Sequence, residues 1–383
     1  MDFALSETEQ LVQKAARDYA ERRLMPIAAA IDESERFPEA ELAGLAELGL
    51  MGVNVPSSLG GAEAGSIAYA LSMMEIARGC ASTAVTMAVT NMVGEILCRY
   101  GTDEQRDKHV PKLTSGEYAA GSFALSEPGS GSDPGGMQTV ATQTADGFVL
   151  DGAKAWVTSG AYAGVIIVWA RTAPPGTHPG GKGISCFVVE KGTPGMNVGR
   201  AERKMGLRGS NTVPITFDGC RLPGGALLGP LHQGFAVAMT ALDGGRIGIG
   251  AQAIGIGTAA LDEAIDYAKT RRAFGQAIGE FQGIQWLIAD SKTELDAARL
   301  LCLRAASLKL EAKPFTREAA IAKLFASEAA NRTCDRALQI HGGYGYVRDY
   351  PVERHVRDVR VTRIYEGTSE IQRMVIARSV LRQ

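Results

Sequence analysis

Residues 139–158 read TVATQTADGFVLDGAKAWVT. In this stretch Asp146-Gly147 separates two runs rich in strand-forming residues, and such a dipeptide is typical of a tight turn between antiparallel strands. Similar short runs, separated by Gly and Pro, follow at Val165–Ala170, Ile184–Val189 and Val213–Phe217. Residues 116–229 are therefore predicted to form a middle antiparallel β domain, of a length typical of one domain.

Helical patterns precede this β domain. Ser6 and Glu9 have the spacing of a capping box, in which each side chain caps the other's backbone N–H at the start of a helix. Between residues 66 and 100 nearly every residue is small or apolar, which is typical of helices buried on all sides. Residues 1–115 are therefore predicted to form an N-terminal helical domain.

Longer helical patterns follow the β domain. Apolar residues recur at helical spacing in the stretches 235–267, 284–310 and 319–340. Helices of this length with short connections are typical of a four-helix bundle. Residues 230–383 are therefore predicted to form a C-terminal four-helix bundle. The expected fold class is α+β, with a helical domain, a β domain and a helical bundle in that order.

Composition narrows the possible partners. The 383 residues carry a formal net charge of −2, too little for a strong attraction to nucleic acid or to an anionic membrane. The six cysteines are scattered and are expected to be reduced thiols in a reducing compartment. The first ten residues resemble neither a secretory signal nor a transit peptide, and the apolar stretch 247–260 is shorter than the roughly 20 residues that span a bilayer. We expect a cytoplasmic protein without membrane insertion.

Several motifs are better explained by structure than by chemistry. Gly255–Ala260 fits a loose dinucleotide-binding fingerprint but lies inside a helical pattern, and Gly176–Lys182 resembles a P-loop that lacks its Ser or Thr. The five histidines have no metal-ligand spacing, so no metal site is expected. The alternating charges between residues 348 and 360 are interpreted as a solvated, salt-bridged helix face.

One acidic residue stands in a setting suited to chemistry. The stretch 364–372 reads IYEGTSEIQ, and Glu366 precedes Gly367 at the start of a predicted helix. Ser369 and Gln372 have capping-box spacing there. A helix N-terminus offers free backbone donors to anions, and glycine lets a ligand approach the backbone closely. From these residues alone, Glu366 is either a functional carboxylate or an ordinary acid of a surface loop.

Two segments of the β domain are suited to a polar or aromatic ligand. Residues 123–133 read FALSEPGSGSD and leave a strand for a Gly/Ser loop, whose hydroxyls and amides can bind ring edges or pyrophosphate. Trp156-Val157-Thr158 lies at a strand end, where the indole either covers an aromatic cofactor or belongs to the core. A plain turn-rich loop remains the alternative for the first segment.

Together with three further motifs, these segments resemble the acyl-CoA dehydrogenase family of flavoproteins over essentially the whole chain. The three motifs are Leu242-Asp-Gly-Gly-Arg246, Arg271-Arg-Ala-Phe-Gly275 and Gln339-Ile-His-Gly-Gly343. The resemblance implies the three-domain fold predicted above and a homotetramer. It also implies FAD, extended between the β domain and the bundle, with its adenine half touching a neighbouring subunit.

The resemblance assigns roles to individual residues. The flavin ring side would be held by Phe123, Leu125, Ser126, Trp156 and Thr158. The pyrophosphate or adenine of a partner's FAD would meet Arg271, Phe274, Gln282, Gln339, Gly342 and Gly343. The cofactor site would be completed by Thr368 and Glu370, and acyl-CoA would be bound by Ser132, Asp243, Arg246 and Gly367.

The resemblance also implies a reaction. Glu366 would remove the α-proton of an acyl-CoA thioester, its backbone N–H and a flavin hydroxyl would stabilise the enolate oxygen, and the β-hydride would pass to flavin N5, giving the trans-2-enoyl-CoA. Electrons would then pass to electron-transferring flavoprotein. Some relatives carry the base just before the arginine of the Leu-Asp motif, but that position is Gly245 here. The chain thus resembles the short-chain and short/branched-chain types.

Some questions stay open from the sequence. An acyl-CoA oxidase and a flavin-free acyl-CoA-binding scaffold are the alternative functions, although oxidases of this family carry an extra C-terminal helical domain. Short or branched acyl groups are expected as substrates. Met87, Met92 and Met239 either close the acyl pocket or belong to the core.

Overall fold

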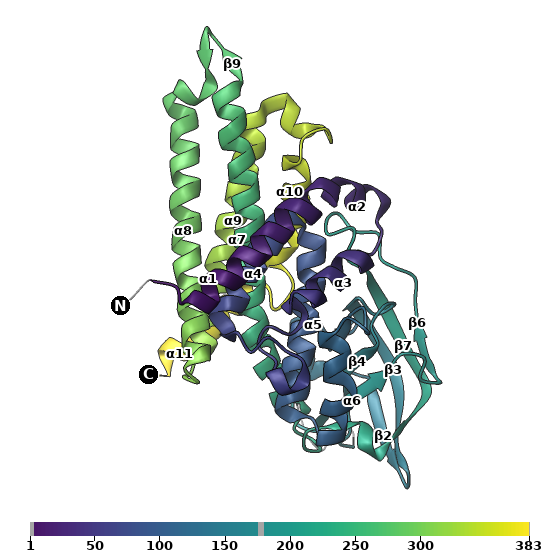
Figure 1. The fold of residues 1–383 in the computed structure, drawn as a ribbon. Helices are drawn as coiled ribbons and strands as arrows, with labels where there is room; N and C mark the ends of the chain where they lie inside the picture. The colour runs from purple at the N-terminus through teal and green to yellow at the C-terminus, as the bar shows by residue number, and fades with distance from the viewer. Residues whose placement is uncertain (1–3, 175–179, 383) are drawn as a thin grey trace.

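The computed structural model describes residues 4–174 and 180–382 and shows a helical region, a β region and a second helical region in sequence order (Figure 1). The predicted fold class is therefore confirmed. The N-terminal helices are α1 (Glu7–Tyr19), α2 (Ala28–Ser34), α3 (Glu39–Glu47), α4 (Gly65–Gly79), α5 (Ala81–Tyr100) and α6 (Asp103–Thr114). The predicted capping box of Ser6 and Glu9 is present at the start of α1. By length and composition α5 could cross a membrane, but most of it is buried inside the protein, as in a core helix.

The middle region is built around one twisted sheet. Its strands are β1 (Gly121–Ala124), β2 (Val140–Thr144), β3 (Gly147–Thr158), β4 (Val165–Arg171), β5 (Ile184–Glu190), β6 (Met196–Val198), β7 (Thr212–Pro223) and β8 (Leu227–Leu228). They follow the order β6-β7-β3-β2-β4-β5-β8, and β1 pairs with β4. The hairpin at Asp146-Gly147 joins β2 to β3 as predicted. The sheet is mixed rather than purely antiparallel, because β1 and β2 both run parallel to β4.

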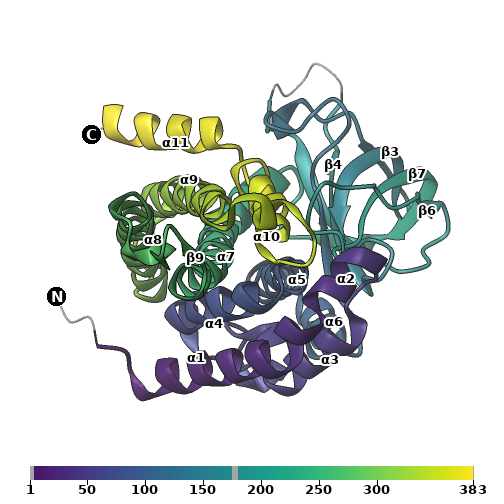
Figure 2. The same ribbon diagram turned by 90° about the horizontal axis from the view of Figure 1, so that it is seen from above.

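The C-terminal region consists of packed helices, three of which are long and lie side by side in Figure 2. They are α7 (Gly234–Thr270), α8 (Gln282–Leu310), α9 (Thr316–His341), α10 (Val352–Val359) and α11 (Ser369–Leu381), with the short hairpin β9 (Arg272–Ala273) and β10 (Gln276–Ala277). Gly255 lies within α7, where an added Cβ would stand 2.2 Å from Met74 O on α4. The glycines of the loose dinucleotide fingerprint therefore serve close helix packing. Of the P-loop-like stretch, residues 176–179 lie outside the described residues.

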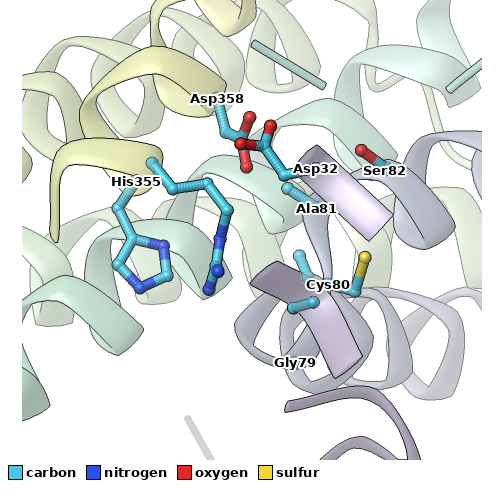
Figure 3. Close-up of a pocket in the computed structure, with 10 residues that line it drawn as sticks. Asp32, Gly79, Cys80, Ala81, Ser82, His355 and Asp358 are labelled. Atoms are coloured by element: carbon cyan, nitrogen blue, oxygen red, sulfur yellow. The ribbon is translucent and has the colours of Figure 1, made fainter. Parts of the chain in front are cut away.

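Helix α10 packs where the three regions meet, which corrects the solvated part of the predicted solvated, salt-bridged face, while Arg357 does form the predicted kind of salt bridge with Glu353. Arg357 bonds to Asp32 of α2 at 2.7 Å, and Asp358, only 4% exposed, accepts a 2.6 Å hydrogen bond from the backbone N–H of Leu207 in the β region. A cavity of about 10 Å³, large enough for about one water, lies between these elements (Figure 3). The charges alternate in sequence, but tertiary packing, not their spacing, decides their exposure.

Candidate active site

Glu366 lies in a strained turn between α10 and α11. Its φ is +54° and that of Gly367 is +87°, so both adopt the left-handed conformation that is costly for a residue with a side chain. The following helix is capped by Thr368, whose Oγ1 accepts from the backbone N–H of Ile371. The capping box predicted at Ser369 and Gln372 is therefore wrong. The helix starts one residue earlier, and the Gln372 side chain bonds back to the turn.

Three buried polar side chains hold this turn by hydrogen bonds. Gln372 donates from Nε2 to the carbonyls of Glu366 at 3.1 Å and Gly367 at 2.8 Å, and Lys323 of α9 donates from Nζ to the Gly367 carbonyl at 2.7 Å. The hydroxyl of Tyr365 donates to Oε1 of Gln252 on α7. Lys323 and Gln252 were not identified from the sequence. The available signal was weak: a polar residue within a run of small and apolar ones.

The pKa of the Glu366 carboxylate lies near neutral pH. Its Oε2 is buried and has no hydrogen-bond partner within the described part of the chain. Burial raises the pKa of Glu366 to about 7, although the nearby cations Arg246 and Lys323 favour its charged form. A carboxylate with a pKa close to the working pH is suited to general base catalysis.

Gly245 makes the space for this carboxylate. A Cβ at position 245 would lie 2.7 Å from Glu366 Oε2, closer than two such atoms can approach. Gly245 also lines a cavity of about 480 Å³ between α5, α7 and the connection from α8 to α9. This volume is within the range of small-molecule sites. Position 245 and the Glu366 side chain therefore compete for the same place beside a ligand-sized cavity.

The predicted acyl-CoA residues occupy different surroundings. Asp243 lines the cavity and bonds to Arg246 at 2.6 Å, while Thr316 donates a hydrogen bond to its other oxygen. Arg246 is only 5% exposed, and its Nε has no partner among the described residues. It is therefore buried, and its charge acts on the nearby carboxylate of Glu366. Ser132 is exposed on the loop that follows β1.

Trp156 lies at a distortion of β3 that turns its ring outward. The register with β7 shifts between Lys154 and Val157, and Trp156 has a φ of +61° and is 63% exposed. Below it, Lys154 and Glu127 form a buried ion pair of 2.7 Å. A large ring held outward by a strained bulge is suited to covering a planar ligand. The structure therefore fits an aromatic cofactor at this face.

The other predicted ring-side residues approach Trp156 mainly through the backbone. The carbonyl of Ser126 accepts a 2.9 Å hydrogen bond from the N–H of Ala155, and that of Thr158 accepts one of 2.6 Å from Ser122 Oγ. The side chains of Leu125 and Phe123 instead pack into the core, Phe123 with its ring 4.3 Å from that of Trp169. Leu125 and Phe123 thus support this face from inside.

A second group of predicted cofactor residues lies at the far end of the helical region, next to β9 (Figure 1). Phe274 is 95% exposed with a φ of +49°, and the Arg271 guanidinium lies 5.3 Å from the centre of the Tyr344 ring. The remaining members are exposed as well: Gln282, Gln339, Gly342 and Gly343. These residues are not brought to Glu366 within one chain. Thr368 and Glu370, in contrast, lie at the start of α11 beside the Glu366 turn.

Among the described residues, the His, Cys, Asp and Glu side chains are not clustered as metal ligands. Within residues 4–174 and 180–382, no group of three or more His, Cys, Asp or Glu side chains is arranged to hold a metal ion. All six cysteines are free thiols, as expected from their scattered positions. The groups available for chemistry are thus a desolvated carboxylate, buried cations and exposed aromatic rings.

Family models match nearly the whole chain. Residues 6–117 match the acyl-CoA dehydrogenase N-terminal domain, residues 122–220 the middle domain and residues 232–381 the C-terminal domain. The mitochondrial short-chain specific acyl-CoA dehydrogenase of Bos taurus is 50% identical over 99% of this chain and 91% of its own length. The acryloyl-CoA reductase (NADH) of Anaerotignum propionicum is 45% identical over 100% and 97%.

Solved structures agree with these sequence relationships. Butyryl-CoA dehydrogenase from Megasphaera elsdenii is 40% identical, covers all of both chains and has a TM-score of 0.96. A chain from a structure described as the electron transferring flavoprotein of Acidaminococcus fermentans gives 38% identity, full coverage of both chains and a TM-score of 0.97. A structure described as PigA with FAD and proline has a TM-score of 0.96 at 29% identity, also over both whole chains.

Proposed function

Because this chain belongs to the acyl-CoA dehydrogenase family, we propose that Glu366 is the base with which it removes the α-proton of an acyl-CoA thioester. The enzyme is an oxidoreductase that acts on a CH–CH bond, and its cofactor is FAD. The proposed product is the trans-2-enoyl-CoA. The observation that carries the assignment is the buried Oε2 of Glu366, unpaired among the described residues and beside the cavity that Gly245 lines.

The α-proton of a thioester is only weakly acidic, so a carboxylate needs help to remove it. Donors already aimed at the developing enolate oxygen supply that help most effectively. The backbone N–H of Glu366 donates no hydrogen bond to any described residue, while the neighbouring carbonyls of Glu366 and Gly367 are held by Gln372 and Lys323. We propose that this free N–H binds the thioester oxygen.

FAD, when bound, supplies the two-electron oxidant that accepts the β-hydride. Trp156 would cover its ring, and Ser126, Thr158, Thr368 and Glu370 would hold the ring side together with the backbone at Phe123 and Leu125. The exposed, bulged position of Trp156 supports this role. Gly367, Asp243, Arg246 and Ser132 would bind the acyl-CoA, with Asp243 and Ser132 at its polar arm.

We propose that short or branched acyl groups are the substrates. Met92 and Tyr69 line the cavity and reduce the space near Gly245, whereas Met87 is fully buried in the core and does not close it. The likeness to short-chain specific acyl-CoA dehydrogenases and to butyryl-CoA dehydrogenase supports the same size class. Activity measured with a series of straight and branched acyl-CoA substrates would decide between the two.

We propose that the active form is a homotetramer in which the exposed end of the bundle meets a neighbour's FAD. Arg271, Phe274, Gln282 and the 339–343 segment are separated from the Glu366 turn within one chain, so they can serve a cofactor site only across subunits. Electron-transferring flavoprotein is the proposed acceptor. A cytoplasmic location is proposed as well, and the six free thiols are typical of a reducing compartment.

Glu366→Gln tests the proposed base. The purified holoenzyme is mixed anaerobically with butyryl-CoA, and loss of the flavin's visible absorbance is followed by stopped flow. We expect bleaching to slow about 10²- to 10⁴-fold, because the general base is lost while its shape is kept. As controls, the variant and the wild type should contain equal amounts of FAD and should bind a product analogue equally well. A variant that bleaches at the wild-type rate would remove Glu366 from the mechanism.

The same preparation separates the alternative activities. Oxygen uptake without added electron-transferring flavoprotein would indicate an oxidase, and a protein without visible absorbance after FAD addition would indicate a flavin-free scaffold. The likeness to an acryloyl-CoA reductase adds a third measurement, NADH oxidation with acryloyl-CoA. The proposed dehydrogenase should need the flavoprotein acceptor. It should show neither oxygen uptake in the absence of that acceptor nor NADH oxidation with acryloyl-CoA.

A further inference from the structure

We propose that Lys323 is a positioning residue of the reaction, which fixes the Glu366–Gly367 turn and keeps a positive charge beside the base. This inference rests on the proposed role of Glu366 and adds a residue on a different helix, 43 positions earlier in the chain. Lys323 itself touches no substrate and acts through the turn.

The Lys323 side chain is buried and its ammonium bonds to the turn. Its side chain is 0% exposed, and its Nζ donates to the Gly367 carbonyl at 2.7 Å. Gln372 donates to the same oxygen at 2.8 Å, so both lone pairs of this carbonyl are used. With the carbonyl fixed from two helices, the left-handed conformation of Glu366 and Gly367 is maintained although it is strained.

Close helix packing isolates the ammonium from water. Gly250 of α7 faces the backbone of α9 at Lys323, where an added Cβ would be 3.6 Å from the Lys323 Cα. Burying an ammonium costs far more than burying a methionine of similar shape, and a buried charge is not normally needed for stability. A lysine at this position is therefore best explained by what its charge does to a neighbour.

The neighbour on which this charge acts is Glu366. The carboxylate of Glu366 favours the ammonium form of Lys323 more strongly than do the carboxylates of Glu328 on α9 and Glu370 on α11. Arg246 of α7 opposes it, and the Tyr69 hydroxyl of α4 is also close enough to Glu366 to feel its charge. Conversely, Lys323 and Arg246 are the two cations that favour the carboxylate form of Glu366. Burial lowers the pKa of Lys323 to about 8, so it is mainly charged at neutral pH.

Removal of this charge should make Glu366 a base only at higher pH. In Lys323→Met and Lys323→Gln, the acid limb of the kcat/KM profile should move up by about one pH unit, which is the usual effect of losing one nearby opposite charge. At pH 6 this corresponds to about a tenfold loss of kcat/KM relative to wild type. Lys323→Gln keeps a donor for the Gly367 carbonyl, so it isolates the charge. Lys323→Arg keeps the charge, so its acid limb should stay in place while its bulk displaces the turn and lowers kcat.

The control is Lys204→Met. Lys204 is another partly desolvated lysine that donates to a carbonyl, that of Ser210 at 2.7 Å, but it lies in the β region. Its removal should leave the acid limb unchanged. Reduced thermal stability in any of the variants is recorded separately and does not enter the comparison of pH profiles.

A second measurement reports on the base without hydride transfer. An acyl-CoA in which sulfur replaces the β-carbon cannot be oxidised at that position, but its α-deuterium still exchanges with water when a base removes it. We expect the exchange profile of each Lys323 variant to show the same shift as turnover. Acid limbs within 0.3 units (roughly twofold in rate) of wild type in Lys323→Met and Lys323→Gln would overturn the proposal. If neither variant folds, wild-type kcat in Lys323→Arg overturns it, and lowered kcat with an unmoved limb supports it.

The two proposals fail differently. If wild-type protein neither bleaches with acyl-CoA nor exchanges the α-deuterium, the function proposed for Glu366 is wrong. If wild-type protein does both, but the Lys323 variants have the same pH profile as the wild type, only the positioning role is wrong.

Discussion

Glu366 combines two costs that a surface loop would not tolerate. Its backbone is left-handed, and its Oε2 is buried without a partner among the described residues. Strain and desolvation of this kind persist where the surrounding structure enforces them, and they cluster at functional sites. The enforcing groups are identifiable here, because Gln372 and Lys323 hold the carbonyls on either side of the Gly367 nitrogen.

The pH dependence of turnover follows from the buried carboxylate. Burial raises the pKa of Glu366 to about 7, so the base form is lost as pH falls through 7 and not through the ordinary range near 4.5. We expect kcat/KM with butyryl-CoA to fall about tenfold for each pH unit below that value. Steady-state kinetics from pH 5 to 9, with stability checked at each end, measures it. A profile that stays flat down to pH 5 would contradict a desolvated base.

Gly245→Ala tests the space that the base needs. The added methyl would lie 2.7 Å from Oε2 and would displace the carboxylate, so kcat should fall at least about tenfold, as expected for a misplacement of roughly 1 Å. Gly244→Ala is the matched control on the same helix. Its Cβ would meet only the flexible end of Lys309 at 3.3 Å, so its effect on kcat should be much smaller. Equal losses in the two variants would contradict the steric argument.

Sequence reasoning proposed a role for Glu366 and singled out Gly245, but it did not name Lys323 or Gln252. From its own stretch Glu366 was either a functional carboxylate or an ordinary loop acid, and only the resemblance to the family favoured the first reading and drew attention to Gly245. The burial of Lys323 depends on how closely α9 packs against α7, which no local pattern reveals. The cap at Thr368 was missed for a related reason, because Ser369 fits the same spacing one residue later.

Among the elements, strand β3 is stiffened by a buried ion pair close to its irregularity at Trp156. Lys154 is fully buried and bonds to Glu127 at 2.7 Å and to the Leu125 carbonyl at 3.3 Å. Glu127 also accepts from the backbone N–H groups of Gln138 and Thr139. One ion pair thus joins β3, the loop after β1 and the start of β2.

Lys154→Met should destabilise the β region strongly. It leaves the Glu127 carboxylate buried without its cation, a change that typically costs about 3–5 kcal/mol. Lys108→Met is the matched control, because Lys108 and Glu190 form an exposed pair worth roughly 0–1 kcal/mol. Thermal unfolding of both variants, with and without added FAD, measures the difference. A Lys154 variant as stable as the Lys108 variant would refute the structural role of the pair.

Most elements were predictable because their signals are local. The capping box of Ser6 and Glu9 and the Asp146-Gly147 turn depend on residues close together in the sequence, and the long helices have regular apolar spacing. The strand that the 123–133 segment was expected to leave is β1, but its partner was not predictable in this way. Its parallel pairing with β4 joins residues more than 40 positions apart, so only the fold brings them together.

Across the whole chain, the residues proposed for the cofactor and the substrate fall into two separate groups. The Glu366 turn and Trp156 belong to the first group, while Phe274 and its neighbours lie exposed at the far end of the bundle. Helix α10 ties the first of these groups to all three regions. Arg357 bonds to α2, Asp358 bonds to Leu207, and Glu366 follows Asp358 by eight residues.

Asp358→Asn tests how this junction contributes to stability. Burial, together with the nearby carboxylate of Asp32, raises the pKa of Asp358 to about 6 (Figure 3). The folded protein therefore holds this proton where the unfolded chain has lost it, so the stabilising contribution is full below pH 4 and is lost as pH rises through 6. Asparagine carries no charge and keeps an oxygen for the Leu207 N–H.

The variant should accordingly gain stability relative to wild type between pH 5 and pH 8, by on the order of 1–3 kcal/mol. The buried His355, whose pKa is lowered to about 3 by burial, is present in both proteins, so its own pH dependence cancels in the difference. Chemical denaturation at both pH values measures the effect, and Asp349→Asn, an exposed acid just before the same helix, serves as control. A difference that is constant or shrinks with rising pH would mean that Asp358 is charged in the folded protein, and that Arg354 and Arg357 outweigh its burial at the junction of the three regions.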